Sequence, residues 1–381
     1  ADALTPSVKY PDTGKYEVVM RGLQPYSRRS DMTTLDASYD LGFATVSSTS
    51  SYFETRAETY YDGTWSTLGL PQAYLPYYTG SPANPRFNSI QRFDDRNRVF
   101  TQEVRLVSNT KGPIDYIVGL FYQKEKNTTV WNGFDPGQTA YNALPGVTIP
   151  GFNPTAPNDR IWDVGGTNQF TDKAVFGELT WHATDKLDLS GGVRVFKQTL
   201  DRTAVSINPV FGLNERGQHS AEFSDSKYRF NATYEYMAGQ RAYFTFSQGF
   251  RRGGANSFSL TGYLREPAVL QNYAPDSVDN YELGAKGRLP NGWRYSADLF
   301  LGKWHDLQIG GFTAINFWPI VFNGREAESK GVELELSGRL SEAFDFQAGY
   351  AYTEATLTNS FCLPSGDGSG HRRPFPHHAD L

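Results

Sequence analysis

The chain has 381 residues, a formal net charge of −5 and 39% hydrophobic residues, with a mean hydropathy of −0.52. The mild acidity argues against a dedicated nucleic-acid binder, which would need a basic surface. No apolar run reaches the roughly 18 residues of a membrane-spanning helix. The aromatic share of 15% instead fits a transmembrane barrel, which carries aromatic belts at both membrane interfaces.

Segments that alternate apolar and polar residues follow one another along the chain. Residues 33–39 and 43–54 predict a first hairpin. Glu103 and Arg105 then alternate with apolar neighbours, and residues 116–122 follow a Gly-Pro turn. Further alternating segments cover residues 187–195, 227–236, 294–301, 332–337 and 344–352. Such period-two patterns place one face toward an apolar environment and the other toward water.

Short and long connections alternate between these strands. Tight turns are predicted at residues 185–186, 238–240, 290–292 and 341–343. Long polar segments, such as residues 127–172 and 252–276, separate the hairpins. Short turns at one end and large loops at the other are typical of an outer-membrane barrel. We therefore predict an all-β, antiparallel, up-and-down transmembrane β-barrel, of which roughly 12 strands are present.

The expected strands are about a dozen residues long, whereas a crossing needs only about 9–11. We expect them to project beyond the bilayer on the loop side. A soluble sandwich also alternates, but its turns recur every 8–12 residues or so. A propeller needs about four strands per fifty-residue repeat, and the hairpins here offer two.

Nothing in the sequence indicates an enzyme. The six histidines form no HExxH or CxxC-type cluster, and no GxSxG elbow is present. His377 and His378 could touch a metal, but an exposed loop is the favoured interpretation. We expect no catalytic residue, no metal site and no cofactor. Charged residues on the polar strand faces, including Glu103, Arg194 and Glu282, are interpreted as a solvated lumen wall with cross-strand pairs.

Several segments resemble the barrel of TonB-dependent outer-membrane receptors of the siderophore-receptor type. They are residues 100–108 with 115–122, 174–181 with 187–194, 247–256, 278–286 and 328–335. Residues 247–256 resemble the strand-to-loop segment of that family, and 278–286 and 328–335 resemble its strands nearer the C-terminus. The resemblance covers most of residues 96–355.

The resemblance implies a surface receptor in the outer membrane of a Gram-negative bacterium. Such receptors import iron–siderophore complexes or similar scarce solutes with energy from TonB. Neither their N-terminal plug domain nor their last strands are recognisable, and their barrel has about 22 strands. We expect residues 1–381 to be a partial barrel domain, with the plug absent and TonB acting through a plug missing from this chain. Open edges are not viable in lipid, which predicts an internal fragment of a longer receptor.

Ligand capture would fall to the long loops. Aromatic rings and arginines suit an anionic complex with flat chelating groups. The candidate ligand-binding residues are Arg251, Arg252, Asn256, Trp65, Trp131, Trp162 and Trp318. Aromatics also form the interfacial belts, so a structural role competes with this interpretation.

Other functions remain open on sequence alone. A passive outer-membrane porin would need a closed barrel without a plug. Cobalamin or an oligosaccharide could replace the siderophore as solute. A soluble carbohydrate-binding or hydrolytic β-protein would have to bury the face of Tyr228 and Phe230. The expected partners are outer-membrane lipid, an iron–siderophore or other small solute, and the TonB complex, and no nucleic acid.

Overall fold

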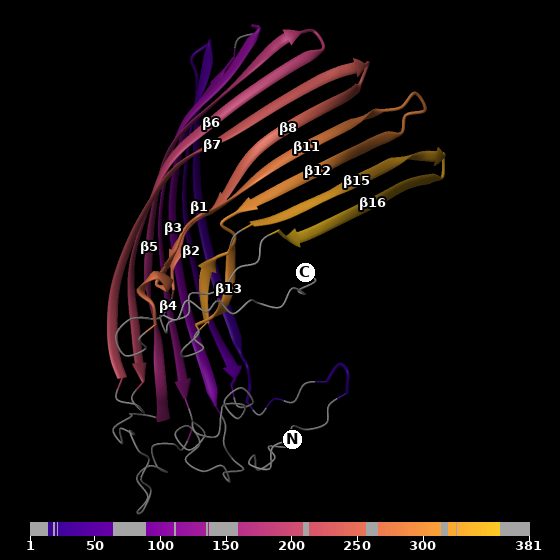
Figure 1. Cartoon of the computed structure of the whole chain (residues 1–381). Coiled ribbons are helices and arrows are strands. Elements are labelled where there is room, and N and C mark those ends of the chain that lie inside the picture. The colour runs from indigo at the N-terminus through magenta and orange to yellow at the C-terminus, as the bar shows by residue number, and fades with distance from the viewer. Residues whose placement is uncertain are drawn as a thin grey trace, which may run out of the picture.

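One continuous antiparallel sheet dominates the protein. The computed structural model describes residues 14–17, 20, 22–63, 89–109, 112–134, 136, 159–208, 213–256, 266–313, 319–324 and 326–358. In these ranges a 12-stranded sheet has the order β1-β2-β3-β4-β5-β6-β7-β8-β11-β12-β15-β16. Each strand pairs with its neighbour in the chain once the small inserted hairpins are left aside. The predicted all-β, up-and-down antiparallel fold is confirmed, as a sheet that is not closed (Figure 1).

The first seven strands are β1 (Tyr26–Asp40), β2 (Ala44–Asp62), β3 (Ile90–Ser108), β4 (Ile114–Phe134), β5 (Arg160–Thr184), β6 (Leu187–Asn208) and β7 (Leu213–Met237). The other five strands of the sheet are β8 (Gln240–Arg251), β11 (Asp276–Arg288), β12 (Arg294–His305), β15 (Glu326–Ser341) and β16 (Phe344–Leu357). Among the described residues, no helix is both long enough and apolar enough to cross a membrane.

The structure has tight turns at the positions that the sequence predicted. Asp185 and Lys186 join β5 to β6, and Gly239 joins β7 to β8 with a positive φ of 72°. Gly292 has a φ of 83° in the turn between β11 and β12. Left-handed backbone of this kind costs glycine nothing because it lacks a Cβ. These two glycines therefore allow the tight turns that close their hairpins.

Strand length is where the sequence-based prediction was wrong. Residues 127–134 and 160–172, expected in a long loop, continue β4 and β5 instead. Strand β4 has 21 residues, and β5 and β7 have 25 each. The extensions contain many polar residues on both faces, so they lack the apolar alternation that marked the rest of each strand. Cross-strand pairing, such as Thr128 opposite Thr167, holds them in the sheet.

The two faces of the sheet differ in chemistry. The outward face of β4–β7 carries exposed apolar residues, among them Leu120, Val175, Leu179, Trp181 and Phe230. On β5 this apolar band runs from Val175 to Trp181. The inward face carries the charged residues predicted for a lumen wall, with ion pairs such as Glu178 with Arg229 at 3.8 Å.

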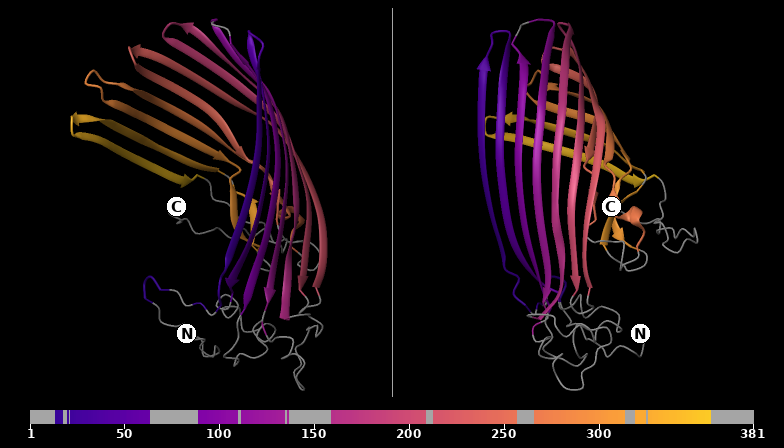
Figure 2. Two further views of the ribbon diagram at one scale, coloured as in Figure 1. Left: turned by 180° about the vertical axis from the view of Figure 1, so that it is seen from behind. Right: turned by 90° about the vertical axis from the view of Figure 1, so that its left-hand side faces the viewer.

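The second half of the sheet turns away from the first (Figures 1 and 2). Strand β7 pairs with β8 only from Arg229 opposite Ser247 to Met237 opposite Gln240. Residues 213–228 of β7 therefore pair only with β6. Strands β8 to β16 fan out across the concave side, as the right-hand view of Figure 2 shows.

Two small hairpins interrupt the second half. Strands β9 (Gly254–Ala255) and β10 (Asn272–Tyr273) pair with each other, with a short 3-10 helix, η4 (Ala268–Leu270), between them. Strands β13 (Gln308–Phe312) and β14 (Pro319–Asn323) form the second hairpin. Both lie on the concave side of the sheet (Figure 1). Residues that the sequence assigned to free loops therefore have regular structure.

Candidate functional site

Residues 252–256, 266–275, 306–313 and 319–324, which include both small hairpins, form what we call the lumen platform. It packs against the inner face of the long strands β4, β5 and β6. Three of the predicted ligand-binding residues, Arg251, Arg252 and Asn256, lie at or just after the end of β8, where a strand was expected to enter a loop. The structure brings them together at the root of this platform.

Arg251 ties the platform to the wall through a buried carboxylate. It lies directly opposite Asp276 in the β8–β11 ladder. Its Nε donates to both carboxylate oxygens of Asp276 at 2.9 and 3.0 Å, and Nη2 also bonds this carboxylate. Asp276 is inaccessible to solvent at the side chain, whereas that of Arg251 is 49% exposed. The backbone N–H of Gln308 donates to the same carboxylate at 2.9 Å, which connects the second hairpin to the same point.

Arg252 reaches the long strands. Its Nη2 lies 2.8 Å from the carboxylate of Glu125 on β4, and its Nη1 lies 3.8 Å from that of Asp172 on β5. The guanidinium also stands 4.3 Å from the ring centroid of Phe170. The carbonyl of Arg252 accepts from the side-chain amide of Gln308 at 2.8 Å. A charged group held by two carboxylates and an aromatic face is a strong anchor.

Asn256 is buried and joins the two hairpins. Its Nδ2 donates to the carbonyl oxygens of Leu270 at 2.6 Å and Val321 at 2.8 Å. Its Oδ1 accepts from the N–H of Val321 at 2.7 Å. The side chain thus satisfies three backbone groups at once, which only an amide of this length could do with both donor and acceptor.

Trp131 and Trp162 lie beneath the platform. Both were expected in long loops but belong to β4 and β5, because those strands continue further than the sequence indicated. Their rings meet edge to face, with centroids 4.4 Å apart and planes at 82°. Both pack against a small apolar core, formed by Val164, Leu270, Ile320 and Phe322. Trp65 and Trp318 lie outside the described residues.

The five described candidates therefore share a structural role, since each holds the platform to the wall or its hairpins to one another. A direct contact with a ligand stays a prediction for them. The apolar side chains that the platform exposes are others: Val269 is 70% exposed and Phe312 is 58% exposed. Arg251, at the root of the platform, is a half-exposed cation. The platform and the end of β8 therefore expose aromatic, aliphatic and cationic side chains.

Sequence reasoning missed several residues that the site depends on, namely Glu125, Asp172, Arg202, Asp276 and Gln308. Arg202 on β6 is buried and donates from Nη1 to the carbonyl of Ala255 at 3.0 Å. Asp276 could have been found from the register, because opposite charges on paired strands are favourable neighbours. The others could not, since their partners are distant in the chain and are set by how the platform folds back.

The inner face of the sheet between the platform and the tight turns carries polar side chains and aromatic rings that pack against them or against one another. Arg194 lies over the ring of Phe121, with a guanidinium-to-centroid distance of 4.8 Å. Phe196 stacks on Phe250 with centroids 4.2 Å apart and planes at 8°. An open groove on this face is lined in part by Glu103, Arg105 and Glu178. A solute passing below the platform would meet this mixed-charge surface.

No metal centre is formed by the described part of the chain: no group of three or more His, Cys, Asp or Glu side chains there could hold an ion. The histidine pair considered for metal binding, His377 and His378, lies outside the described residues. His182 contacts two carboxylates at the turn end of the sheet, with Nε2 at 2.9 Å from Asp115 and Nδ1 at 2.7 Å from Asp188.

Curated proteins of related sequence are receptors. The pesticin receptor of Yersinia enterocolitica is 26% identical over 255 residues, which is 67% of this chain and 33% of that protein. The ferripyoverdine receptor of Pseudomonas aeruginosa is 27% identical over 179 residues, or 45% of this chain and 19% of that protein. The chain thus spans a third or less of the length of these relatives.

Solved structures show the same fold. The ferric yersiniabactin uptake receptor FyuA of Yersinia pestis superposes with a TM-score of 0.67 at 18% identity, covering 89% of this chain and 45% of that one. The siderophore receptor PiuA of Acinetobacter baumannii gives a TM-score of 0.61 at 16% identity, covering 92% and 49%. The copper transporter OprC gives 0.57 at 13% identity, covering 87% and 48%. At these identities the likeness concerns the fold alone.

The family model "TonB dependent receptor-like, beta-barrel" matches residues 4–379. This match covers nearly the whole chain and agrees with the ordered set of resembling segments, the strand order and the apolar outward band. The chain therefore belongs to the TonB-dependent receptor β-barrel family, whose members are transport proteins of the Gram-negative outer membrane.

Proposed function

We propose that this chain forms the barrel wall and the solute-facing platform of an active importer for an iron–siderophore complex. The observation that carries the proposal is the lumen platform on the concave side of the sheet, with the exposed side chains of Val269 and Phe312 and, at its root, the half-exposed Arg251. Flat chelating groups would stack on the aromatic ring, and an anionic complex would be attracted by the half-exposed guanidinium.

The choice of solute rests on the relatives. The ferripyoverdine receptor and the siderophore and yersiniabactin receptors are named for iron complexes. The copper transporter has the same fold, so the fold does not choose between metal complexes. Among the sequence relatives, the ferripyoverdine receptor, at 27% identity, favours the siderophore over cobalamin or an oligosaccharide.

Energy coupling is the second part of the proposal. We infer that TonB drives import through a plug domain encoded elsewhere in the full protein. The chemistry is binding and gated passage, with no covalent step. The polar inner wall would then contact the plug with residues such as Glu103 and Arg105.

The test is solute uptake by cells that express the full-length protein in a strain lacking its own siderophore receptors. We expect uptake of at least one radiolabelled ferric siderophore, and its loss when TonB is deleted. Uptake that persists without TonB would contradict active import and indicate a passive pore. Uptake of cobalamin or an oligosaccharide, with none of any ferric siderophore, would show that the solute is wrong while the transport class is right.

A further inference from the structure

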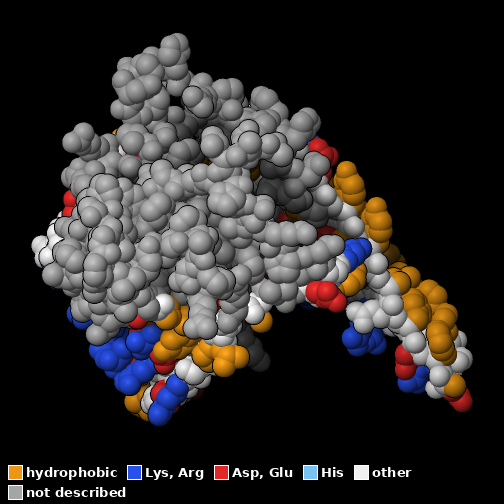
Figure 3. Space-filling model, turned by 90° about the horizontal axis from the view of Figure 1, so that it is seen from below, with side chains coloured by type: hydrophobic (Ala, Val, Ile, Leu, Met, Phe, Trp, Pro, Cys, Tyr) orange, Lys and Arg blue, Asp and Glu red, His pale blue; other side chains and the backbone are white. Residues whose placement is uncertain are grey.

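A buried arginine beneath the lumen platform has no counter-ion. Figure 3 shows Lys and Arg side chains at the surface of the loop end, where water hydrates them. Arg202 on β6, in contrast, is only 7% exposed. A guanidinium group keeps its charge in proteins, and an ionised group taken out of water without a partner is strongly destabilising. The charge of Arg202 therefore requires a compensating negative charge.

The hydrogen bonds of Arg202 go to neutral groups. Its Nη1 donates to the side-chain oxygen of Asn168 at 2.8 Å and to the carbonyl oxygen of Ala255 at 3.0 Å. In the part of the chain that the structure describes, no carboxylate pairs with this guanidinium. The stretches outside the described residues that adjoin β6, β7 and the platform also contain no Asp or Glu; they are residues 209–212, 257–265 and 314–318.

The other two arginines that hold the platform are balanced. Arg252 has the carboxylate of Glu125 at 2.8 Å, and Arg251 donates to both carboxylate oxygens of Asp276. Among these three arginines, Arg202 alone has no carboxylate partner within the described ranges. The inner face beneath the platform therefore carries one positive charge more than its own carboxylates compensate.

A histidine lies directly across from Arg202. Arg202 and His219 are partners in the β6–β7 ladder, on the inner face of the sheet. The Cβ atoms of such partners are about 4.5–5.5 Å apart. Nε of Arg202 and Nε2 of His219 are both enclosed and have no hydrogen-bond partner among the described residues. Burial and then the charge of Arg202 lower the pKa of His219, so the ring is neutral near pH 7 and can carry its proton on Nε2.

A glycine leaves room beside the histidine nitrogen. A Cβ at Gly217 would lie 2.9 Å from Nε2 of His219, so any other residue there would crowd this atom. A water molecule beside it would satisfy the two nitrogen atoms but would leave the charge of Arg202 unbalanced. A small anion would accept from both donors and would also supply the missing negative charge.

We propose that Arg202 and His219 bind a small inorganic anion such as chloride beneath the lumen platform. The anion accepts from Nε of Arg202 and Nε2 of His219 and neutralises the guanidinium. Because the same guanidinium donates to Ala255 on β9, the anion also stabilises the docked platform. This site is separate from the surface proposed to meet the imported solute.

The direct test is a soak of bromide, which replaces chloride and scatters X-rays anomalously, into crystals of the full-length protein. We expect an anomalous peak within hydrogen-bonding distance of both nitrogen atoms. Gly217→Ala keeps both side chains but fills the space beside His219, and should lose the peak. Gly191→Ala, whose added Cβ meets nothing within 4 Å, should keep it. Ordered side chains of Arg202 and His219 without bromide between them would overturn the proposal.

A solution measurement checks the effect on the platform. At equal ionic strength, replacing chloride by the bulky anion gluconate should speed proteolysis within residues 252–324 at least fivefold. His219→Leu, which keeps the hydrogen bonds of Arg202, should raise the chloride concentration needed for half protection at least tenfold. Arg229→Gln, which removes an exposed cation of the inner face, should respond to chloride as the unchanged protein does. Equal proteolysis in chloride and gluconate, or an equal shift in Arg229→Gln, would contradict the site.

Discussion

The first seven strands and the last five differ most on the loop side of the sheet. Strands β4 to β7 have 21–25 residues, whereas β8, β11 and β12 have 12 or 13. A crossing needs only about 9–11, so the short strands are near the minimum and the long ones far exceed it. In the second half, the described residues between β8 and β11 and between β12 and β15 form most of the lumen platform.

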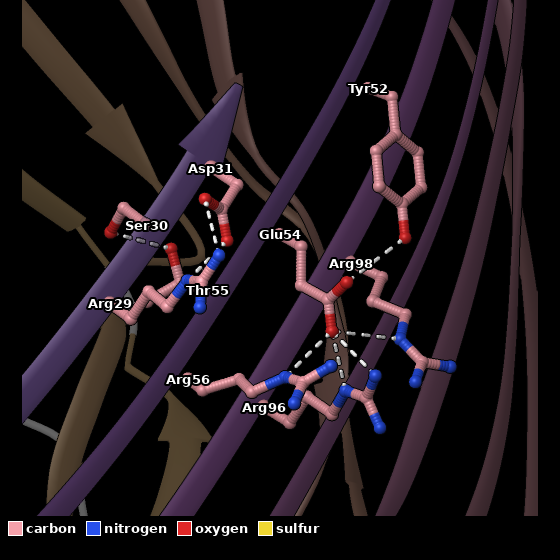
Figure 4. A network of polar contacts seen from close by, with 9 residues as sticks. All are labelled: Arg29, Ser30, Asp31, Tyr52, Glu54, Thr55, Arg56, Arg96 and Arg98. Carbon is pink, nitrogen blue, oxygen red and sulfur yellow. Dashed lines mark hydrogen bonds and ion pairs between the residues drawn. The ribbon is translucent and has the colours of Figure 1, made fainter. Parts of the chain in front are cut away.

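This difference shows what the extra strand length is for. Phe170, Asp172 and Arg202, which contact the platform, lie in the extended parts of β5 and β6, and Glu125 lies opposite Phe170 just before the extended part of β4. The outer face of the extended β2 and β3 carries Arg56, Arg96 and Arg98, which all donate to the carboxylate of Glu54 (Figure 4). The extensions therefore provide a docking surface inside and a charged surface outside, beyond what the membrane requires.

The largest effect should come from Asn256→Ala, because the change leaves three backbone groups of Leu270 and Val321 without their partner. Each buried unsatisfied group costs about 1–3 kcal/mol, so the platform should lose about 3 kcal/mol of local stability. We expect rapid proteolysis within residues 252–324 of the folded protein. The exposed Asn109→Ala at the turn end, which also loses side-chain hydrogen bonds, should leave the platform resistant. Equal resistance of Asn256→Ala would show that the platform does not depend on this side chain.

A smaller loss is expected for Arg251→Met, which leaves the buried carboxylate of Asp276 with the N–H of Gln308 and without its ion-pair partner. Breaking a fully buried pair costs about 3–5 kcal/mol, and the half-exposed arginine reduces this to about 2. The double variant Arg251→Met/Asp276→Asn, which removes both charges and keeps an acceptor for the Gln308 N–H, should recover most of the loss, which a double-mutant cycle in urea would measure. Additive losses would mean that the two residues do not act as a pair.

The wall itself can be tested without touching the platform. Gly119 lies directly opposite Phe176, and a Cβ at Gly119 would run into that ring. Gly119→Ala should destabilise the sheet by about 1–2 kcal/mol through overpacking, seen as a lower unfolding midpoint in detergent. Gly191→Ala is the matched control, since nothing lies within 4 Å of its added Cβ. Equal midpoints for the two variants would contradict the close ring packing.

The smallest effect concerns pH at the turn end. Hydrogen bonds to Asp115 and then Asp188 raise the pKa of His182, which lies on the turn side of the apolar band. A raised pKa means that the protonated form adds stability fully below about pH 6.5, and that this stability is lost as the pH rises through the folded-state value. The unfolding midpoint should therefore fall slightly between pH 6 and pH 9, and His182→Gln should flatten this dependence. If the unfolding midpoint of the variant depended on pH as strongly as that of the unchanged protein, groups other than His182 would cause the dependence.

The sequence was sufficient for the fold because the apolar alternation and the turn signals are local. The turns at Gly239 and Gly292 and the segment from Tyr228 to Tyr236 are examples. The sequence did not predict the full length of the strands that contain Trp131 and Trp162. These strands continue through polar residues, and no apolar alternation marks a strand beyond the membrane. The anchors Arg251 and Arg252 were located correctly at a strand end. Their partners Glu125 and Gln308 could not be predicted, because the fold of the platform brings them together.

Hydrogen–deuterium exchange of the full protein in nanodiscs tests most directly whether the platform is docked on the long strands. We predict that amides of residues 254–256, 270–273, 308–312 and 320–323 exchange as slowly as those of β4 and β5, and that Arg252→Gln accelerates them while the turn-side amides stay unchanged. Exchange of these amides within seconds in the unchanged protein, at the rate of an exposed loop, would contradict the account.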